Sequence, residues 1–169
     1  MLQRYNFCPQ CGGRLLYRAI DDRQRLKCDS CQFILYENPI VGVAGILLQE
    51  GKILLGRRKQ GYAGKWCIPC GYVEWDEPLE QALIREFREE TGLEVVPHQL
   101  FAAKSNFHDP NSHTVGIWYM VKVIGGTLQA GDDLDQVGFF SLDQEPELAF
   151  PTDREVIRML RAIEANILK

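Results

Sequence analysis

The chain has 169 residues, of which 46% are hydrophobic, and its formal net charge is −4. This length fits one ordinary domain, or one domain with a small module, and the composition can supply a core. The slight excess of acidic residues excludes a general attraction to nucleic acid or anionic membranes, so a phosphate ligand would need local charge or a metal. No stretch approaches the ~20 apolar residues of a membrane span, and residues 1–7 lack the apolar segment of a signal peptide. We therefore expect a cytoplasmic protein with neither a membrane nor a nucleic acid as partner.

Two Cys-x-x-Cys pairs come first along the chain, Cys8 with Cys11 and Cys28 with Cys31. Four thiolates at this spacing are typical of a tetrahedral Zn²⁺ site of the zinc-ribbon type. Residues 1–37 are too few to build a sufficient core, so the metal should supply much of the folding free energy. A closed four-cysteine site has no open coordination position, which indicates a structural zinc. The basic residues of this segment suggest nucleic-acid binding but more often form a solvated face.

Residues 38–169 form the second predicted domain, and Pro39 marks its start because proline restricts its predecessor to extended conformations. A hairpin should join residues 40–48 to residues 53–55 around a glycine turn. Further extended segments are predicted at residues 66–74, 95–104, 115–124 and 137–142. Helices are predicted at residues 78–91 and after Pro151, where Thr152 and Glu155 would form a capping box. The pattern predicts an α+β layered domain.

The first predicted helix carries carboxylates on the side that should face the core. Glu86 and Glu90 point in the same direction as its apolar stripe, and Glu89 lies within about 100° of Glu90. Like charges at such a margin repel one another and lose solvation, and a divalent cation would relieve both effects. Mg²⁺ prefers such oxygen ligands. The alternative is that the acids lie at the solvated edge of an amphipathic helix.

Gly71, Glu77 and the segment at residues 85–93, Arg-Glu-Phe-Arg-Glu-Glu-Thr-Gly-Leu, resemble the Nudix box at every defined position. The resemblance implies a mixed β-sheet sandwiched between helices, preceded here by the zinc ribbon. It implies that Glu86, Glu89 and Glu90 bind catalytic Mg²⁺ or Mn²⁺, together with the main-chain oxygen of Cys70. By the same resemblance, Arg85 and Glu77 brace the loop and orient the carboxylates, and Gly71 and Gly92 are structural.

The implied reaction is attack by water on a diphosphate phosphorus, with divalent ions neutralising charge and helping to deprotonate the water. The general base comes from a box glutamate in some members of the family and from a later loop in others. Gln136 stands where relatives commonly carry glutamate. Asp133 and Asp135 are therefore the candidate bases on that loop, although the same run can be read as an exposed turn.

A zinc ribbon followed by a Nudix domain resembles two groups of enzymes. The NADH pyrophosphatases carry a specificity motif that residues 104–110 do not match. A shorter type acts on FAD and ADP-ribose, and residues 71–74 and 148–150 resemble it. We therefore expect hydrolysis of FAD or ADP-ribose with release of AMP. The alternatives are an NADH pyrophosphatase and a non-catalytic nucleotide or nucleic-acid sensor, and a homodimer is expected only by resemblance.

Substrate contacts are predicted at two arginines and several aromatic residues. Arg57 and Arg58 alternate sides of a strand, so one of them could hold phosphate bidentately, although such arginines are more often surface residues. Tyr72, Trp75, Phe107 and Trp118 could stack on a flavin or adenine ring, although aromatic residues in strands more often belong to the core. None of the three histidines shows a metal-ligand spacing.

Cys67 and Cys70 form a third Cys-x-x-Cys pair. In an extended strand, residues three apart are roughly 10 Å apart and face opposite sides. A disulfide needs Cα atoms within about 7 Å of each other. A redox pair is therefore disfavoured at this position. Cys70 also replaces the glycine that relatives of the family usually carry before the box.

Overall fold

The computed structural model describes residues 4–167, and the chain divides into two compact units, Met1–Asn38 and Pro39–Lys169. The smaller unit holds three antiparallel strands in the order β1-β2-β3. Their bounds are Leu15–Ile20, Arg23–Cys28 and Ile34–Leu35. Its buried cluster consists of Cys8, Leu15, Leu26 and Cys28. Cysteine sulfurs therefore make up a large part of this small core.

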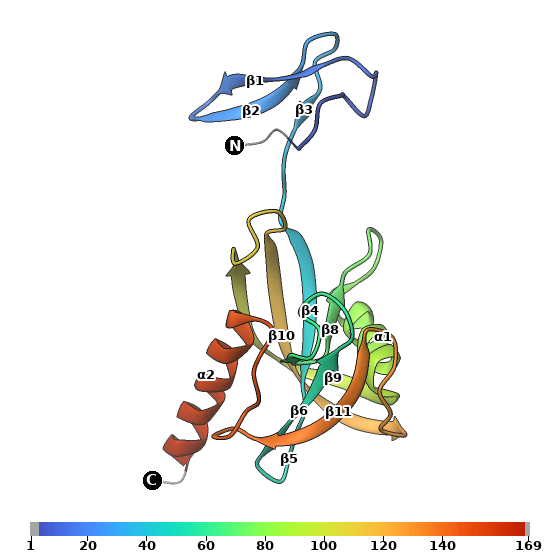
Figure 1. Cartoon of the computed structure of the whole chain (residues 1–169), viewed down its shortest axis with the longest axis vertical. Coiled ribbons are helices and arrows are strands. Elements are labelled where there is room, and N and C mark those ends of the chain that lie inside the picture. The colour runs from blue at the N-terminus through green and yellow to red at the C-terminus, as the bar shows by residue number, and fades with distance from the viewer. Residues whose placement is uncertain (1–3, 168–169) are drawn as a thin grey trace. The chain divides into compact units, whose positions relative to one another are not determined.

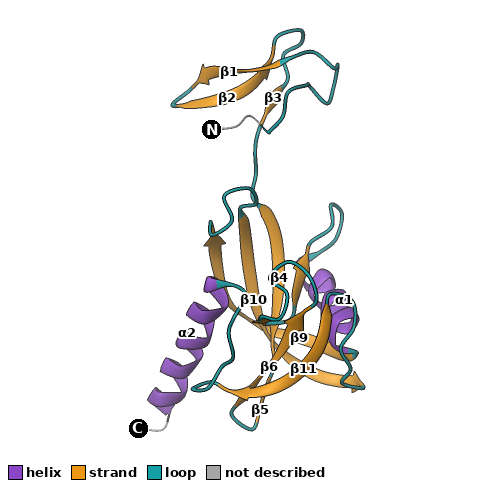
Figure 2. Cartoon of the chain, viewed as in Figure 1, coloured by secondary structure: helices purple, strands orange, loops and turns teal. Residues whose placement is uncertain are grey.

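The larger unit contains two sheets and two helices (Figures 1 and 2). One sheet has the order β8-β4-β10-β9, and the other has the order β11-β6-β5 with β7 paired to β6. The bounds are β4 Ile40–Ile46, β5 Leu48–Gln49, β6 Lys52–Arg58, β7 Trp66–Cys67, β8 Cys70–Tyr72, β9 Leu93–Asn106, β10 Thr114–Gly126 and β11 Leu134–Ser141. The helices are α1 (Leu79–Thr91) and α2 (Pro151–Ile167). No helix in residues 4–167 is long and apolar enough to cross a bilayer.

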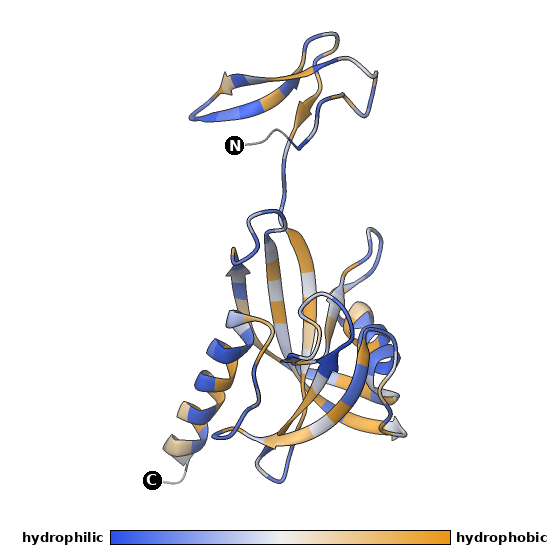
Figure 3. Cartoon of the chain, in the orientation of Figure 1, coloured by the Kyte–Doolittle hydropathy of each residue, from blue (hydrophilic) through white to orange (hydrophobic). Residues whose placement is uncertain are grey.

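Alternating residues of β4 belong to two buried clusters, and each cluster contains residues of a different helix. Val43 belongs to the buried cluster that contains Phe87 of α1, whereas Ala44 and Ile46 belong to the cluster that contains Val156, Ile157 and Leu160 of α2. Because successive side chains of a strand point to opposite faces, the helices cover opposite faces of this sheet. Figure 3 shows apolar residues on the side of α2 that faces the strands. The predicted α+β sandwich is confirmed.

Close packing of α1 depends on a glycine in the central strand. A Cβ atom at Gly45 would lie 2.4 Å from the Phe87 ring, so any side chain there would force the helix outward. The helix ends at Gly92, whose φ of 70° is left-handed and whose N–H donates to the Arg88 carbonyl. Glycine at this position closes the helix without strain. The carboxylates of α1 are thereby held at a fixed height above β4 and β8.

One sequence-based expectation about local structure, the hairpin, is confirmed only in part, and two others are wrong. Most of residues 40–48 pairs in parallel with β10, and only Leu48 and Gln49 pair with β6. Residues 66–74 are not one strand, since β7 pairs with β6 and β8 pairs with β4. The capping box at Thr152 is absent because α2 already begins at Pro151. The two differences in the strands arise because sheet pairing is decided by distant segments and not by local pattern.

Candidate active site

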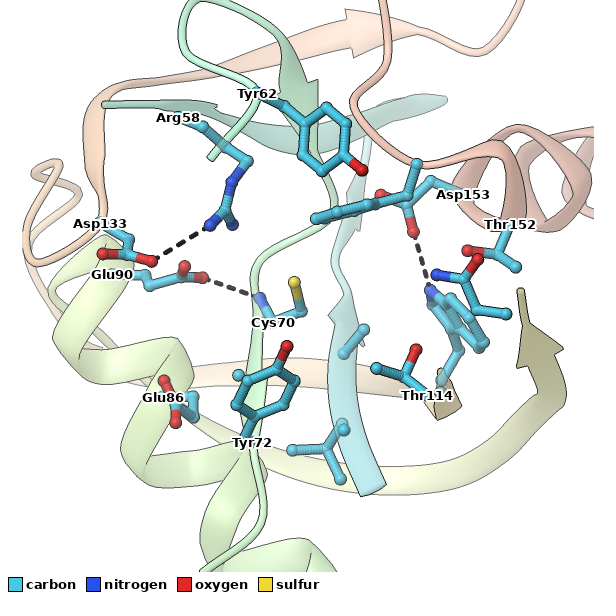
Figure 4. Close-up of a pocket in the computed structure, with 18 of the residues that line it drawn as sticks. Arg58, Tyr62, Cys70, Tyr72, Glu86, Glu90, Thr114, Asp133, Thr152 and Asp153 are labelled. Atoms are coloured by element: carbon cyan, nitrogen blue, oxygen red, sulfur yellow. Dashed lines mark hydrogen bonds and ion pairs between the residues drawn. The ribbon is translucent and has the colours of Figure 1, made fainter. Parts of the chain in front are cut away.

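A cavity of about 380 Å³ opens between α1, β8, β10 and the loops before α2 (Figure 4). Box carboxylates Glu86 and Glu90 line one part of it. Arg58, Tyr62, His108 and Phe150 line another part. Its lining also includes Cys70, Gly71, Tyr72, Asp132, Asp133, Trp118, Thr152 and Asp153. Segments far apart in the sequence thus meet around one space.

Glu90 is the most buried of the box carboxylates, with 1% of its surface exposed. Its Oε2 atom accepts a 2.7 Å hydrogen bond from the main-chain N–H of Cys70. Burial raises the pKa of Glu90 well above its ordinary value. An ionised carboxylate with so little solvation needs a nearby positive charge.

Glu86 lies directly over the box glycine. A Cβ atom at Gly71 would lie 1.8 Å from the carboxylate carbon of Glu86, so only glycine leaves room for this side chain. Burial also raises the pKa of Glu86. This contact gives a physical reason for a glycine at the start of the box: it lets a carboxylate rest against the backbone of β8.

Arg85 connects the acidic residues around the helix. It forms two hydrogen bonds to the Glu77 carboxylate, of 2.9 and 2.7 Å, and a third of 3.1 Å to the Tyr72 carbonyl. Its Nη1 atom lies 2.7 Å from Glu86 and 3.3 Å from Glu89. Such bidentate pairing fixes the loop before α1 relative to the helix. The hydrogen bonds lower the pKa of Glu77, which therefore stays ionised.

The donor set fits a hard divalent cation. Glu86 and Glu90 are carboxylates that lose solvation at the cavity wall, and a bound cation would offset that loss. Glu89 is more exposed and does not line the cavity. Within residues 4–167 these carboxylates do not converge as tightly as the four cysteines do, and Arg85 Nη1 is a shared partner of Glu86 and Glu89.

The two candidate bases from the later loop differ in position. Asp133 lines the cavity and lies 3.2 Å from Arg58. Asp135 is outside the cavity lining, and Arg57 binds both its oxygens at 2.7 and 3.0 Å. That hydrogen bonding lowers the pKa of Asp135. The arginines therefore differ as well, since Arg58 lines the cavity and Arg57 does not.

Of the aromatic residues predicted to contact substrate, only Tyr72 and Trp118 line the cavity. Trp75 is 100% exposed, and Phe107 packs on His113. Trp118 is buried and donates its indole N–H to Asp153, so it belongs to the core wall. The prediction that Trp75 contacts the substrate therefore has no support from the cavity geometry.

Three rings that the sequence analysis did not predict as substrate contacts gather at the cavity. Tyr62 lies 5.6 Å from the rings of both His108 and Phe150, and Arg58 lies over Phe150 at 5.4 Å. Tyr62 has a φ of 74°, an unfavourable value for a residue with a side chain. Gly61 and Gly64, both also at positive φ, flank it closely and were the only sequence signal of this loop.

Asp153, in the first turn of α2, is a buried carboxylate that lines the cavity. It accepts hydrogen bonds from the Ile68 N–H at 3.0 Å and from Trp118 Nε1 at 3.2 Å. Burial raises the pKa of Asp153 to about 7. It therefore ties α2 to the segment that leads into Cys70.

Cys67 and Cys70 pack in one buried cluster, whereas the sequence predicted that they face opposite sides of a strand. Cys70 packs against the cluster that contains Cys67, and a hydrogen bond to the Cys67 thiol, followed by burial, raises the pKa of Cys70 well above its ordinary value. The expectation assumed one continuous strand. Ile68 and Pro69 instead carry the chain from one sheet to the other, so the opposite-face argument does not apply.

The four N-terminal cysteines form a separate cluster in the smaller unit. Their sulfur atoms all lie within 4.8 Å of one another, and three of the separations are 3.5, 3.5 and 3.8 Å. Sulfurs bound at about 2.3 Å around a tetrahedral zinc are about 3.8 Å apart. The N–H groups of Ser30 and Cys31 each lie 3.4 Å from the Cys28 sulfur. The cluster is consistent with a zinc ribbon.

Comparisons with known proteins agree with this geometry. Residues 38–160 match the NUDIX domain model, and residues 6–37 match the Nudix N-terminal zinc-ribbon model. An ADP-ribose pyrophosphatase of Methanocaldococcus jannaschii is 39% identical over 80% of this chain and 81% of its own. The NAD-capped RNA hydrolase NudC of Pseudomonas aeruginosa is 30% identical over 93% of this chain, which spans 55% of that protein. A NUDIX hydrolase structure from Nitrosomonas europaea, 31% identical, covers 90% of this chain and 88% of its own with a TM-score of 0.79.

Proposed function

Because the chain belongs to the Nudix hydrolase family and is a pyrophosphohydrolase, we propose that its substrate is ADP-ribose, cleaved with release of AMP. FAD, which has the same adenosine diphosphate moiety, is the second substrate of this proposal. The observation that carries the proposal is the cavity, which combines buried carboxylates with a cation and three rings. The relative from Methanocaldococcus jannaschii supports the choice of ADP-ribose.

In this proposal Glu86, Glu89 and Glu90 hold Mg²⁺ or Mn²⁺ together with the Cys70 carbonyl. The bound ion would neutralise the diphosphate charge and lower the pKa of the attacking water. Arg85 keeps Glu86 and Glu89 oriented through its hydrogen bonds. Asp133 is our candidate for the proton acceptor, because it lines the cavity while Asp135 is bound by Arg57.

Arg58 is proposed to bind the diphosphate, because it is the only arginine or lysine of the described residues in the cavity lining. Its Nε atom donates to the Gly61 carbonyl at 2.8 Å, and its guanidinium lies over Phe150. A guanidinium fixed in this way retains donors for a phosphate in a defined plane. Tyr62, His108 and Phe150 are proposed to stack on the adenine ring.

The test is AMP release from ADP-ribose, FAD, NADH and NAD with Mg²⁺ or Mn²⁺. We expect ADP-ribose or FAD to have the highest kcat/KM, and Glu86→Gln to lower turnover roughly 10³-fold. Glu94→Gln, the same change at an exposed position of β9, serves as the matched control. A preference for NADH, or no turnover of any of the four, would overturn the proposed substrate.

A second candidate substrate is an NAD-capped RNA, and a surface of the zinc-ribbon unit favours it. Arg18 pairs with Arg25 and Leu16 pairs with Lys27, so these cations share one face of the sheet. Arg25 also lies 4.8 Å from the Tyr36 ring. None of these cations has a carboxylate within ion-pair distance in residues 4–167. Like charges opposite each other are destabilising unless an anion binds them, and cations interleaved with an aromatic ring suit single-stranded RNA.

This second candidate is tested with an NAD-capped oligonucleotide and free NAD at several salt concentrations. Binding through phosphates predicts a higher kcat/KM for the capped RNA that falls as salt rises. The double variant Arg18→Gln/Arg25→Gln should lose that advantage, while Arg158→Gln, at an exposed position of α2, should keep it. Equal kcat/KM for capped RNA and free NAD would exclude the candidate.

A further inference from the structure

The backbone passes from one sheet of the larger unit to the other at residues 68–70, the crossing segment. Cys67 ends β7 in one sheet, and Cys70 begins β8 in the other. Pro69 has no N–H group, so the main-chain donors of the crossing segment are those of Ile68 and Cys70. The Pro69 carbonyl accepts a 2.9 Å hydrogen bond from the Gly45 N–H. The position of the segment therefore depends on what these two donors bind.

Both donors of the crossing segment bind carboxylates. The Ile68 N–H donates to Asp153 Oδ2 at 3.0 Å. The Cys70 N–H donates to Glu90 Oε2 at 2.7 Å. Ile68, Asp153 and Glu90 are all buried. Water does not compete for hydrogen bonds at this depth, and a buried donor without a partner is strongly unfavourable, so each carboxylate holds its end of the segment.

The two carboxylates come from different helices. Glu90 lies in the last turn of α1, and Asp153 lies in the first turn of α2. These helices cover opposite faces of the sheet that contains β4 and β8. Figure 4 shows Glu90 and Asp153 on either side of the segment that carries Cys70. A displacement on the α2 side is thus passed to Glu90 through three residues of backbone.

Asp153 is itself held in one orientation. Its Oδ1 atom accepts a 3.2 Å hydrogen bond from Trp118 Nε1, so its two oxygens have different donors. Trp118 lies in β10, which is paired on both sides, with β4 and with β9. The carboxylate cannot rotate without leaving a buried donor unpaired. The sheet therefore fixes Asp153, and Asp153 fixes the Ile68 N–H.

We propose that Asp153 is a positioning residue for the divalent-metal site and acts on it through Ile68 and the backbone of Cys70. The proposal rests on the proposed function, in which Glu90 and the Cys70 carbonyl bind the ion. Both ligands depend on the crossing segment, because Glu90 is hydrogen-bonded to it and the carbonyl is part of it. Groups that orient metal ligands typically change metal affinity by about 10–100-fold when they are replaced.

The first test is calorimetric titration of the full, zinc-loaded chain with Mn²⁺. Asp153→Asn keeps the size of the side chain but leaves one acceptor oxygen for two donors, so the Kd for Mn²⁺ should rise about tenfold. Asp143→Asn, the same change at a side chain that is 86% exposed, should leave the Kd unchanged. If Asp153 served only the fold, the melting temperature of Asp153→Asn would fall with no change in Kd, and this outcome would overturn the proposal.

A second measurement needs neither a catalytic metal nor turnover. Hydrogen exchange of the Cys70 amide, followed by NMR without Mn²⁺ or Mg²⁺, reports how firmly the crossing segment is held against Glu90. In Asp153→Asn this exchange should accelerate relative to that of the Leu83 amide in α1, which reports general opening of the larger unit. Acceleration shared by both amides, or none at Cys70, would contradict the proposed link.

Trp118→Phe is the second variant, because it removes the indole donor and leaves the Ile68 hydrogen bond. The freed oxygen lets Asp153 turn, so the Kd for Mn²⁺ should rise, but less than in Asp153→Asn. An unchanged Kd in Trp118→Phe would count against the proposal even if Asp153→Asn did not fold.

Turnover separates this proposal from the proposed function. A higher KM for ADP-ribose in Asp153→Asn with an unchanged Kd for Mn²⁺ would mean that Asp153 contacts the substrate, and would overturn the positioning role. If the wild type binds Mn²⁺ but cleaves neither ADP-ribose nor FAD, the proposed substrate fails. The Kd comparison and the Cys70 exchange still decide the role of Asp153 in that case.

Discussion

The two units of the chain use their metal-binding side chains in opposite ways. In the smaller unit, Cys8 and Cys28 are part of the buried cluster, so the proposed zinc ligands are also the core. In the larger unit, Glu86 and Glu90 lie beside a core that packs without them, and protein donors already hold them. From this difference we expect that loss of metal unfolds the smaller unit but only inactivates the larger one.

The largest effect is expected from removing the zinc site. Structural zinc contributes an apparent ~10–16 kcal/mol in small zinc-finger peptides, which a unit with so small a core cannot replace. Cys8→Ser should therefore abolish hydrogen-exchange protection in residues 4–38 while ADP-ribose turnover persists. Ser30→Ala, which lies between Cys28 and Cys31 and removes no sulfur, should keep the protection. If turnover were lost together with zinc, the larger unit would depend on the zinc site, which contradicts the difference between the units.

The converse change is Glu86→Gln in the larger unit. Loss of a ligand that holds the catalytic ion should lower kcat by roughly 10³-fold, since such an ion supplies several kcal/mol of transition-state stabilisation. The melting temperature should stay near that of wild type, because burial already disfavours the Glu86 charge. Retained turnover would show that Glu86 is not a ligand, and a large drop in melting temperature would show that the carboxylate supports the fold.

These two predictions concern residues that the sequence identified, for a physical reason. The cysteine pairs and the glutamates of α1 lie three or four positions apart, and local geometry brings such residues together in a knuckle or on a helix. The resemblance to the Nudix box added Gly71, and the structure shows the Glu86 contact that only glycine permits. Short-range chemistry is therefore readable without a structure.

The rest of the cavity could not be predicted, because its residues come from separate loops. Tyr62, His108 and Phe150 meet only after β6, β9 and α2 have packed, and no single periodicity links them. Cys67 and Cys70 were placed on opposite sides by assuming one strand, whereas the chain crosses between two sheets there and both residues pack in one cluster. Sheet pairing is set by tertiary context, which a local pattern does not contain.

Asp153 can be compared with Glu90, because it is also a buried carboxylate but is not proposed to bind metal. Its pKa of about 7, against an ordinary 3.8, means that the native state keeps a proton that the unfolded state loses between these values. The stability from this group is complete below about pH 4 and is lost as pH rises through 7, by about 2–4 kcal/mol. Asp153→Asn should remove this slope.

The measurement is urea unfolding of wild type and Asp153→Asn from pH 5 to pH 8. Both proteins contain the same cysteines and the same Glu90, so the difference between their curves reports Asp153 alone. The wild type should lose free energy of unfolding relative to the variant as pH rises. Parallel curves would show that the hydrogen bonds from Ile68 and Trp118 keep this carboxylate ionised.

The smallest effect is expected from Arg58→Lys, which keeps the charge but loses the planar group. Arg58 stacks on Phe150, pairs with Asp133 and donates to the Gly61 carbonyl, and an ammonium cannot make all these contacts at once. The value of kcat/KM for ADP-ribose should fall about tenfold, the loss of one charged hydrogen bond. Arg57→Lys, whose partner Asp135 lies outside the cavity, should change it little. Equal losses would mean that the charge of the strand, and not the geometry of Arg58, serves the substrate. A loss confined to Arg58→Lys would show that the two units also differ in their cations. In residues 4–167 the ribbon cations Arg18, Arg25 and Lys27 have no carboxylate partner, whereas Arg58 is held by Phe150, Asp133 and the Gly61 carbonyl.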